Sequence, residues 1–280
     1  MDKIIDLHIH SNASDGSFTP SEIINLACEI KISAISITDH DTINGQKEAL
    51  SCKTSIEVIP GVEVSTDYSR MLHILGYCFD IHNQELNNKL EYFRNGRKIR
   101  NELIIKKLNE LGMKIKLDEV LENAADGVPG RPHIAQVLLT NGYVKTIQQA
   151  FDKYLKKGAV AYFNRAKLLP DETIRLIKQA GGIPVMAHPI QTGLAGDRLV
   201  KLVKNLKDCG LAGIEVWYSA HSDEQTKFYQ FIAKKFRLIQ TGGTDFHGKN
   251  KPDIKLGKGF GNLKIPYSCV KSLKKSNLKF

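Results

Sequence analysis

Short runs of β-branched and other apolar residues alternate with longer stretches of helical periodicity along most of the chain. Such alternation is typical of βα units packed around a mostly parallel sheet, so we expect an α/β protein. The apolar runs predict strands at residues 3–9, 34–38, 57–64, 72–79, 183–187, 212–217 and 237–242.

Capping residues mark where the intervening helices begin and end. Thr19-Pro20-Ser21-Glu22 and Ser222-Asp223-Glu224-Gln225 each combine a hydroxyl N-cap with a Glu or Gln three residues later, which is the pattern of a capping box. Gly181-Gly182 and Gly210 follow helical stretches, where glycine supplies the left-handed residue that ends a helix. Strands and helices are therefore predicted from independent signals.

The spacing of the strands predicts an irregular barrel with an insertion. Residues 57–64 and 72–79 are only about seven residues apart, whereas a parallel crossover needs about a dozen or more, so this pair should form an antiparallel hairpin. Residues 81–169 show apolar spacing of three and four residues, which predicts a helical cap. We expect residues 1–80 and 170–280 to form the barrel domain and 81–169 the inserted cap.

Histidine and aspartate recur together in three segments, each directly after an apolar, strand-like run. The three segments are Asp6-Leu7-His8-Ile9-His10, Thr38-Asp39-His40-Asp41 and Thr244-Asp245-Phe246-His247. Because alternate residues of a strand point the same way, His8 and His10 share one face while Leu7 and Ile9 face the helical layer. The carboxyl ends of barrel strands form active sites, so these side chains predict a metal site there.

Four further residues are candidates for the same site. Glu63 and His73 each lie within an apolar run, His188 follows Met186-Ala187, and Asp15 lies in the first loop. A buried carboxylate is costly unless a cation or partner compensates it. An ordinary turn is the competing interpretation for Asp15, and a hydrogen-bonded residue for any single histidine, but their joint occurrence favours a metal. We expect Asp6 to orient a ligand histidine through a hydrogen bond.

Charge is distributed unevenly along the 280 residues. The formal net charge is +10, and residues 81–169 hold 16 Lys or Arg against 9 Asp or Glu, so +7 belongs to this segment. A basic module beside a metal site favours an anionic substrate, with a solvated lysine-rich surface as the competing interpretation. The hydrophobic fraction of 42% excludes a disordered chain.

Cysteine content and hydropathy bear on the compartment. The five cysteines are odd in number and form no C-x-x-C pair, which favours neither a disulfide framework nor a thiolate zinc site. No apolar run approaches the roughly 20 residues that cross a bilayer, and residue 3 already begins a predicted strand, leaving no room for a signal peptide. We expect a cytoplasmic protein with no membrane contact and no obligate protein partner.

The ordered set D-x-H-x-H, T-D-H-D, a lone Glu, a lone His, A-H-P and T-D-x-H resembles the PHP (polymerase and histidinol phosphatase) superfamily over essentially the whole chain. The resemblance implies a distorted (β/α)7 TIM-like barrel with a trinuclear metal centre at the carboxyl ends of its strands. The implied metal sites are formed by His8, His10, Glu63 and Asp245, by Glu63, His73 and His188, and by Asp15, His40 and His247. These nitrogen and oxygen ligands suit Mn²⁺, Zn²⁺ and Fe²⁺ alike, so two to three such ions are expected.

Clustered divalent ions suit hydrolysis of a phosphate ester, because they polarise phosphoryl oxygens and lower the pKa of a bound water. The expected nucleophile is a hydroxide on the metals, and no side chain is named as general acid. Asp39 and Asp41 are expected to support the metal ligands rather than bind metal themselves.

The insertion contains a candidate phosphate-binding segment, Gly130-Arg131-Pro132-His133. Proline marks a helix start, whose free N–H groups attract anions, so Arg131 and His133 are predicted to hold a substrate phosphate. A capped helix with a surface arginine is the competing interpretation. His221 follows a predicted strand and is a candidate substrate contact, and the stripe of Arg94, Arg97 and Arg100 either contacts phosphate or is solvated.

The Gly-Arg-Pro-His segment also resembles the PHP subgroup of nucleoside 3′,5′-bisphosphate phosphatases and 5′→3′ exoribonucleases. The predicted function is therefore a metal-dependent phosphoesterase, acting as a nucleoside 3′,5′-bisphosphate 3′-phosphatase, as a 5′→3′ exonuclease on short oligoribonucleotides, or as both. One alternative is a histidinol-phosphate phosphatase, which assays on both substrates would distinguish. Another is a non-catalytic nucleic-acid-binding PHP domain, which would need no complete ligand set. A polymerase proofreading domain would belong to a much longer chain.

Overall fold

The computed structural model describes residues 3–123, 129–164 and 167–277, and within them eight strands form two sheets. The first sheet is parallel, in the order β1-β2-β3, and the second has the order β4-β5-β6-β7-β8. The strands are β1 (Ile4–Ile9), β2 (Ile32–Ile37), β3 (Glu57–Val58), β4 (Gly61–Ser65), β5 (His73–Tyr77), β6 (Ile183–Met186), β7 (Gly213–Tyr218) and β8 (Ile239–Gly243). The α/β class is confirmed.

The two sheets are not closed into one barrel, so the predicted distorted (β/α)7 barrel is not confirmed. Among the described residues the two sheets are joined by isolated bridges, from Ile9 to Phe246, which follows β8, and from His40, which follows β2, to Glu63. The predicted strand 57–64 is broken because Pro60 cannot donate a ladder hydrogen bond. The chain changes sheets there: β3 pairs with β2, and β4 pairs with β5.

Gly61 is required where the chain changes sheets. A Cβ built on Gly61 would lie 2.1 Å from Ser36 Oγ and 2.7 Å from Thr38 Cγ2, so only glycine lets β4 approach β2 this closely. The predicted hairpin is confirmed, since β4 and β5 are antiparallel with Glu63 opposite Leu75. Strand β6 is also antiparallel to β5, and β7 and β8 then continue in parallel.

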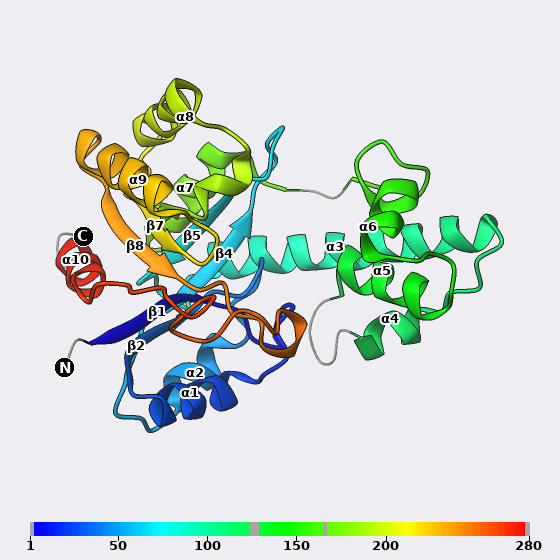
Figure 1. Cartoon of the computed structure of the whole chain (residues 1–280), viewed down its shortest axis with the longest axis horizontal. Helices are drawn as coiled ribbons and strands as arrows, with labels where there is room; N and C mark the ends of the chain where they lie inside the picture. The colour runs from blue at the N-terminus through cyan, green and yellow to red at the C-terminus, as the bar shows by residue number, and fades with distance from the viewer. Residues whose placement is uncertain (1–2, 124–128, 165–166, 278–280) are drawn as a thin grey trace.

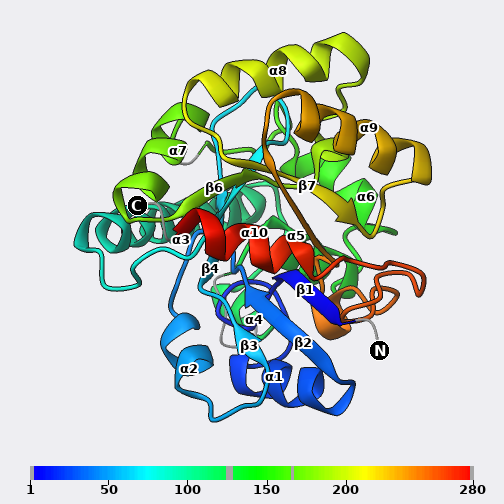
Figure 2. The same ribbon diagram turned by 90° about the vertical axis from the view of Figure 1, so that its left-hand side faces the viewer.

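Helices cover the outer faces of the sheets, with α1 and α2 on one side and α7, α8 and α9 on the other (Figure 2). Thr19 and Ser222 form the two predicted capping boxes, and Gly181 and Gly210 have the predicted left-handed conformation. The helices are α1 (Pro20–Glu29), α2 (Gln46–Ser51), α7 (Pro170–Gln179), α8 (Gly196–Asp208), α9 (Asp223–Lys235) and α10 (Ser268–Asn277), with 3₁₀ turns at Pro189–Thr192 and Gly248–Asn250.

The insertion extends away from the sheets along α3, with α4, α5 and α6 around its far half (Figure 1). Leu86 and Leu90 on the near half pack with strand residues, while Ile104 and Leu108 on the far half join a separate apolar core. The elements are α3 (Gln84–Glu110), α4 (Leu117–Asn123), α5 (Arg131–Thr140) and α6 (Ile147–Ala150), followed by a π-helical turn at Phe151–Leu155.

The division of the chain at residues 81–169 stays a prediction, because α3 belongs to both apolar cores. Residues 124–128 and 165–166 of this segment lie outside the described part of the chain. None of the helices that the structure describes combines the length and the hydropathy that crossing a membrane requires.

Candidate metal centre

The first strand delivers two buried imidazoles to one face, as the alternation of side chains predicts. His8 lies near the end of β1 and His10 just after it, and neither is exposed to solvent. Leu7 and Ile9 point the other way, each into an apolar core between strands and helices. The pattern of this strand thus fixes which side chains face the interior of the site.

Glu63 lies at the centre of the site, fully buried on β4. Nitrogens of five imidazoles, brought by β1, β5 and the ends of β2 and β6, surround its two oxygens. The distances to Oε2 are 3.3 Å from His8 Nε2, 3.3 Å from His10 Nε2 and 3.0 Å from His40 Nδ1, and those to Oε1 are 2.9 Å from His73 Nδ1 and 2.7 Å from His188 Nε2.

Two aspartates complete the cluster from other loops. Asp245 Oδ1 lies 3.2 Å from His10 Nε2 and 3.4 Å from His247 Nδ1. Asp15 Oδ1 lies 3.3 Å from His247 Nε2, and Asp15 Oδ2 lies 3.8 Å from His40 Nε2. All nine residues that the sequence nominates as ligands therefore lie side by side, although their role as ligands stays a prediction.

Whether a cation fits the cluster around Glu63 can be judged from its buried polar atoms, several of which have no hydrogen-bond partner. Buried polar groups are nearly always paired, because leaving one unpaired costs roughly 1–3 kcal/mol. The unpaired atoms here are His8 Nε2, both ring nitrogens of His10, His40 Nδ1 and Glu63 Oε2. All of them point into one cluster of imidazole and carboxylate groups, which is the donor set of a divalent transition metal.

The geometry divides the donors into three overlapping groups whose atoms lie within 4.8 Å of one another. The groups are His10, Asp15, His40 and His247; His8, His10 and Glu63; and His40, Glu63 and His73. Glu63 is shared by two groups, as the resemblance implies, whereas Asp245 and His188 lie beside the groups rather than in them. The exact allocation of ligands to metals stays a prediction.

Burial and neighbouring charges shift the acidity of these groups in opposite directions. Burial would raise the pKa of Glu63, but the charges of His40 and His73 hold that pKa well below its ordinary value. Burial lowers the pKa of His73 to about 4, in spite of Glu63. Burial also acts to lower the pKa of His10, but the neighbouring carboxylates of Asp245 and Glu63 raise the pKa to about 9. Metal binding must therefore displace protons from this cluster.

One buried carboxylate of the site was not predicted. Glu215 on β7 is fully buried, its Oε1 lies 3.0 Å from His8 Nδ1, and its Oε2 accepts the backbone N–H of His188 at 2.7 Å. The signal was present, because Ile214 and Val216 flank Glu215 as apolar residues flank Glu63.

Asp6 supports the backbone of the site rather than an imidazole ring. Its carboxylate accepts hydrogen bonds from the backbone N–H groups of His8, Thr244 and Gly257, at 3.3, 2.9 and 2.9 Å. Asp6 therefore ties β1 to the end of β8. The prediction that it orients a ligand histidine holds only for the backbone of His8, since the ring is held by Glu215.

Asp39 supports the loop that carries Asp15. Its Oδ1 accepts from the Ser11 N–H at 2.7 Å and from Ser14 Oγ at 2.6 Å, and its Oδ2 accepts from Ser11 Oγ at 2.6 Å. None of the nine candidate ligands touches Asp39 in these contacts. They agree with the predicted supporting role.

Asp245 is held from behind by two residues that the sequence did not single out. The Tyr218 hydroxyl donates to Asp245 Oδ2 at 2.9 Å, and Lys251 Nζ lies 2.8 Å from the same oxygen. Gln191 donates in turn to the Tyr218 hydroxyl at 2.8 Å. These contacts leave Oδ1 of Asp245 facing the imidazoles.

The predicted phosphate-binding residues lie at the start of α5. His133 Nδ1 accepts the backbone N–H of Gly130 at 2.9 Å, so this side chain caps its own helix. Arg131 donates to the Leu155 carbonyl at 3.0 Å and lies 5.6 Å from the centre of the Tyr162 ring. The structure therefore gives both residues structural contacts, and phosphate binding by them stays a prediction.

The arginine stripe of α3 divides into three different environments. Arg97 donates to Asp41 Oδ2 at 2.5 Å and lies beside Gly130, so it joins the end of β2 to the start of α5. Arg100 is buried and bonded to Asn101 Oδ1. Arg94 lies 3.6 Å from Glu91 on the same helix.

His221, the remaining candidate substrate contact, packs behind Tyr218. Its Nδ1 donates to the Val216 carbonyl at 2.9 Å, and its ring lies 5.1 Å from that of Tyr218 and 4.6 Å from that of Tyr229. It therefore reaches the site through Tyr218 in this structure. A direct substrate contact stays a prediction.

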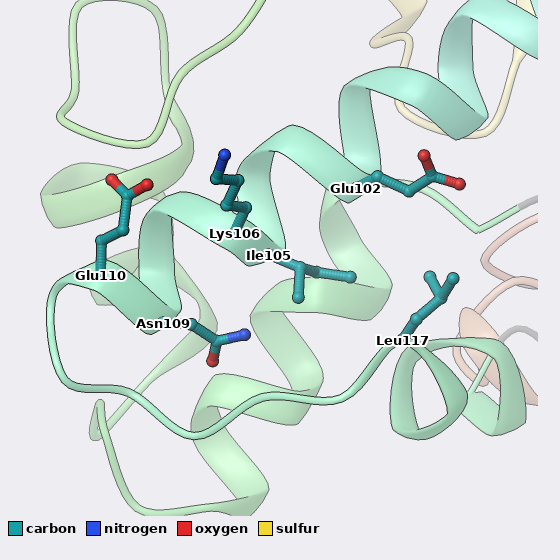
Figure 3. Close-up of a pocket in the computed structure, with 6 residues that line it drawn as sticks. All are labelled: Glu102, Ile105, Lys106, Asn109, Glu110 and Leu117. Atoms are coloured by element: carbon teal, nitrogen blue, oxygen red, sulfur yellow. The ribbon is translucent and has the colours of Figure 1, made fainter.

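A surface depression of about 550 Å³ lies elsewhere, on the far half of α3 (Figure 3). None of the nine candidate ligands contributes to it. Its lining residues are Glu102, Ile105, Lys106, Asn109, Glu110 and Leu117. The depression is therefore separate from the metal centre.

Sequence relatives cover most of the chain. A 5′-3′ exoribonuclease of Haemophilus influenzae is 34% identical over 250 residues, which are 88% of this chain and 91% of that protein. A 3′,5′-nucleoside bisphosphate phosphatase of Chromobacterium violaceum is 31% identical over 247 residues, 87% of each protein. A phosphoribosyl 1,2-cyclic phosphate 1,2-diphosphodiesterase of Eggerthella lenta is 28% identical over 253 residues, 88% of this chain and 95% of that protein.

Solved structures share the fold over nearly the whole chain. One is a Bifidobacterium adolescentis protein described as a metal-dependent phosphoesterase. Its structure has a TM-score of 0.83 and 28% identity, and the match covers 97% of this chain and 95% of that one. An amidohydrolase from Chromobacterium violaceum with bound sulfate and no metal has a TM-score of 0.81 and 28% identity, covering 97% and 96%. Residues 6–180 match the model of the PHP domain, so this protein belongs to the PHP family that its motifs resemble.

Proposed function

We propose that this protein is a metal-dependent phosphoesterase that hydrolyses phosphate esters of nucleotides, either a nucleoside 3′,5′-bisphosphate or the 5′ end of a short oligoribonucleotide. The observation that carries the proposal is the cluster around Glu63, where buried imidazole and carboxylate atoms converge without hydrogen-bond partners. Relatives named as an exoribonuclease and as a bisphosphate phosphatase support a nucleotide substrate.

Two to three divalent ions, Mn²⁺, Zn²⁺ or Fe²⁺, are the proposed cofactor. When bound, such ions polarise phosphoryl oxygens and activate water for attack on phosphorus. The proposed ligands are His8, His10, Asp15, His40, Glu63, His73, His188, Asp245 and His247. The protein's own contribution is to hold these groups in a buried site and to balance their charge.

The start of α5 is the proposed binding site for a substrate phosphate. Arg131 and His133 lie there, and Arg97 approaches Gly130 while bonded to Asp41 at the end of β2. An anion between these groups would be attracted by two guanidinium charges and by the helix N-terminus. The segment 81–169, with its net charge of +7, is proposed as a cap over the metal site.

The two sheets are proposed to be a broken form of the (β/α)7 barrel of the family. The single bridges that join β1 to the β8 end and β2 to β4 support this proposal. A cytoplasmic location also stays a proposal, for which the five free thiols are the supporting observation.

The decisive experiment compares metal-stripped protein with protein supplied with Mn²⁺ on three substrates. These are adenosine 3′,5′-bisphosphate, a 5′-phosphorylated oligoribonucleotide and histidinol phosphate. Mn²⁺-dependent hydrolysis of either nucleotide, absent from the Glu63→Gln variant, would support the proposal. Faster hydrolysis of histidinol phosphate would favour that alternative, and RNA binding without hydrolysis of any substrate would favour a non-catalytic domain.

A further inference from the structure

Glu215 is a fully buried carboxylate, and among the residues that the structure describes its ion-pair partner is an imidazole rather than a lysine or arginine. Burying an ionised carboxylate costs several kcal/mol unless hydrogen bonds and charge compensate it. A buried carboxylate in the middle of β7 is therefore expected to have a specific structural role. The contacts of its two oxygens identify that role.

The first oxygen fixes the orientation of a candidate metal ligand. Oε1 of Glu215 lies 3.0 Å from Nδ1 of His8. Because a carboxylate accepts hydrogen bonds and does not donate them, Nδ1 of His8 carries a proton. The other nitrogen, Nε2, then faces Glu63 Oε2 at 3.3 Å and has no hydrogen-bond partner. Glu215 thus selects the nitrogen of His8 that is available to a metal.

The second oxygen fixes the backbone that carries another candidate ligand. Oε2 of Glu215 accepts the N–H of His188 at 2.7 Å. His188 has a φ of 23°, a strained conformation for a residue with a side chain. The bond from Glu215 holds this turn, and the His188 ring reaches Glu63 Oε1 with its Nε2 at 2.7 Å. The two held rings lie 5.7 Å apart and are stacked.

We propose that Glu215 is a positioning residue of the metal centre, which aims His8 and His188 at the cluster without binding metal itself. Both of its oxygens already accept hydrogen bonds from protein donors, whereas Oε2 of Glu63 accepts none. The inference rests on the proposed function only in that the cluster binds metal.

The test measures Mn²⁺ affinity and stoichiometry by titration of the metal-free full chain. The Glu215→Gln variant keeps the shape of the side chain but has one accepting oxygen for two donors. Loss of a partner that orients a ligand lowers metal affinity by about 10–100-fold, and we expect this loss for Glu215→Gln. The matched control is Glu57→Gln on β3, because Glu57 contacts Lys274 and Tyr267 and no candidate ligand. The control should bind Mn²⁺ as the parent does.

A second measurement needs no substitution at position 215. In the Zn²⁺-loaded parent with ¹⁵N-labelled histidine, the His8 ring should show a slowly exchanging proton on Nδ1 and metal on Nε2. Coordination through Nδ1 of His8 would overturn the proposal, as would parental Mn²⁺ affinity in a folded Glu215→Gln variant or an equal loss in Glu57→Gln. Metal binding is measured here without substrate, so a protein that hydrolyses no nucleotide would refute the proposed function and leave this inference intact.

Discussion

Alanine at position 243 should both destabilise the protein and disturb the metal centre. Gly243 ends β8 beside β1, and a Cβ built on it would lie 2.1 Å from His8 Cβ and 2.3 Å from His8 N. These atoms belong to a strand and cannot rotate away, so β1 and β8 must separate by more than 1 Å to reach ordinary contact, which begins at 3.4 Å. Overpacking of this kind costs about 1–3 kcal/mol and occasionally more.

Alanine at position 96 is the control, and it should change the free energy of unfolding in the opposite direction. Gly96 lies within α3, and a Cβ there meets nothing within 4 Å. Alanine at an open helical position stabilises by roughly 0.5–1 kcal/mol. Gly96→Ala should therefore raise the midpoint of urea unfolding, while Gly243→Ala should lower it.

Thermal and chemical unfolding of the metal-free proteins give the free energies, and Mn²⁺ titration gives the functional effect. In a chain of this size each kcal/mol shifts the Tm by roughly 2–4 °C, so Gly243→Ala should lose several degrees. Its Mn²⁺ affinity should fall as well, because the clash displaces His8. Unchanged stability and unchanged Mn²⁺ affinity in Gly243→Ala would refute the packing of β8 against β1 described above.

Three other outcomes are expected. Saturating Mn²⁺, at about 100 times its Kd, should stabilise the parent by about 2.7 kcal/mol for each ion bound and the Glu63→Gln variant by much less, as differential scanning calorimetry with and without the metal would measure. Arg131→Ala should lower kcat/KM more on adenosine 3′,5′-bisphosphate than on p-nitrophenyl phosphate, and equal losses on both substrates would contradict phosphate recognition by Arg131. Iodoacetamide at pH 8 should modify the exposed Cys209 well before Cys269, because burial raises the pKa of Cys269 to about 12. Mass spectrometry of the native protein at successive times would give the order of modification, and earlier modification of Cys269 would contradict this prediction.

The candidate site could be predicted from sequence where a local pattern carries the information. Alternation along one strand was enough to give His8 and His10 a common face, and an apolar run was enough to mark Glu63 as a buried carboxylate that needs a partner. Glu215 has the same apolar neighbours and was still missed. The groups that contact a buried carboxylate come from the adjacent strands, and the residue spacing within one strand does not indicate which groups these are.

The fold shows the same limit at the junction of the two sheets. The hairpin of β4 and β5 followed from loop length alone, since a short connection permits only antiparallel pairing. Pro60 was visible in the sequence and marks the break within the predicted strand 57–64. Closure of the sheets, in contrast, depends on pairing between β1 and β8, which are separated by most of the chain.

The turn after β2 joins three parts of the protein through consecutive residues. Asp39 fixes the loop that carries Asp15, His40 faces Glu63, and Asp41 binds Arg97 of the insertion. Asp41 has a φ of 55°, a conformation that costs about 1–2 kcal/mol for a residue with a side chain. Such strain persists where surrounding bonds fix it and is concentrated at functional sites. Arg97 also lies beside the start of α5. A movement of the insertion would therefore displace the turn that positions His40. The position of the proposed phosphate site and the geometry of the metal centre are therefore mechanically connected through Asp41 and Arg97.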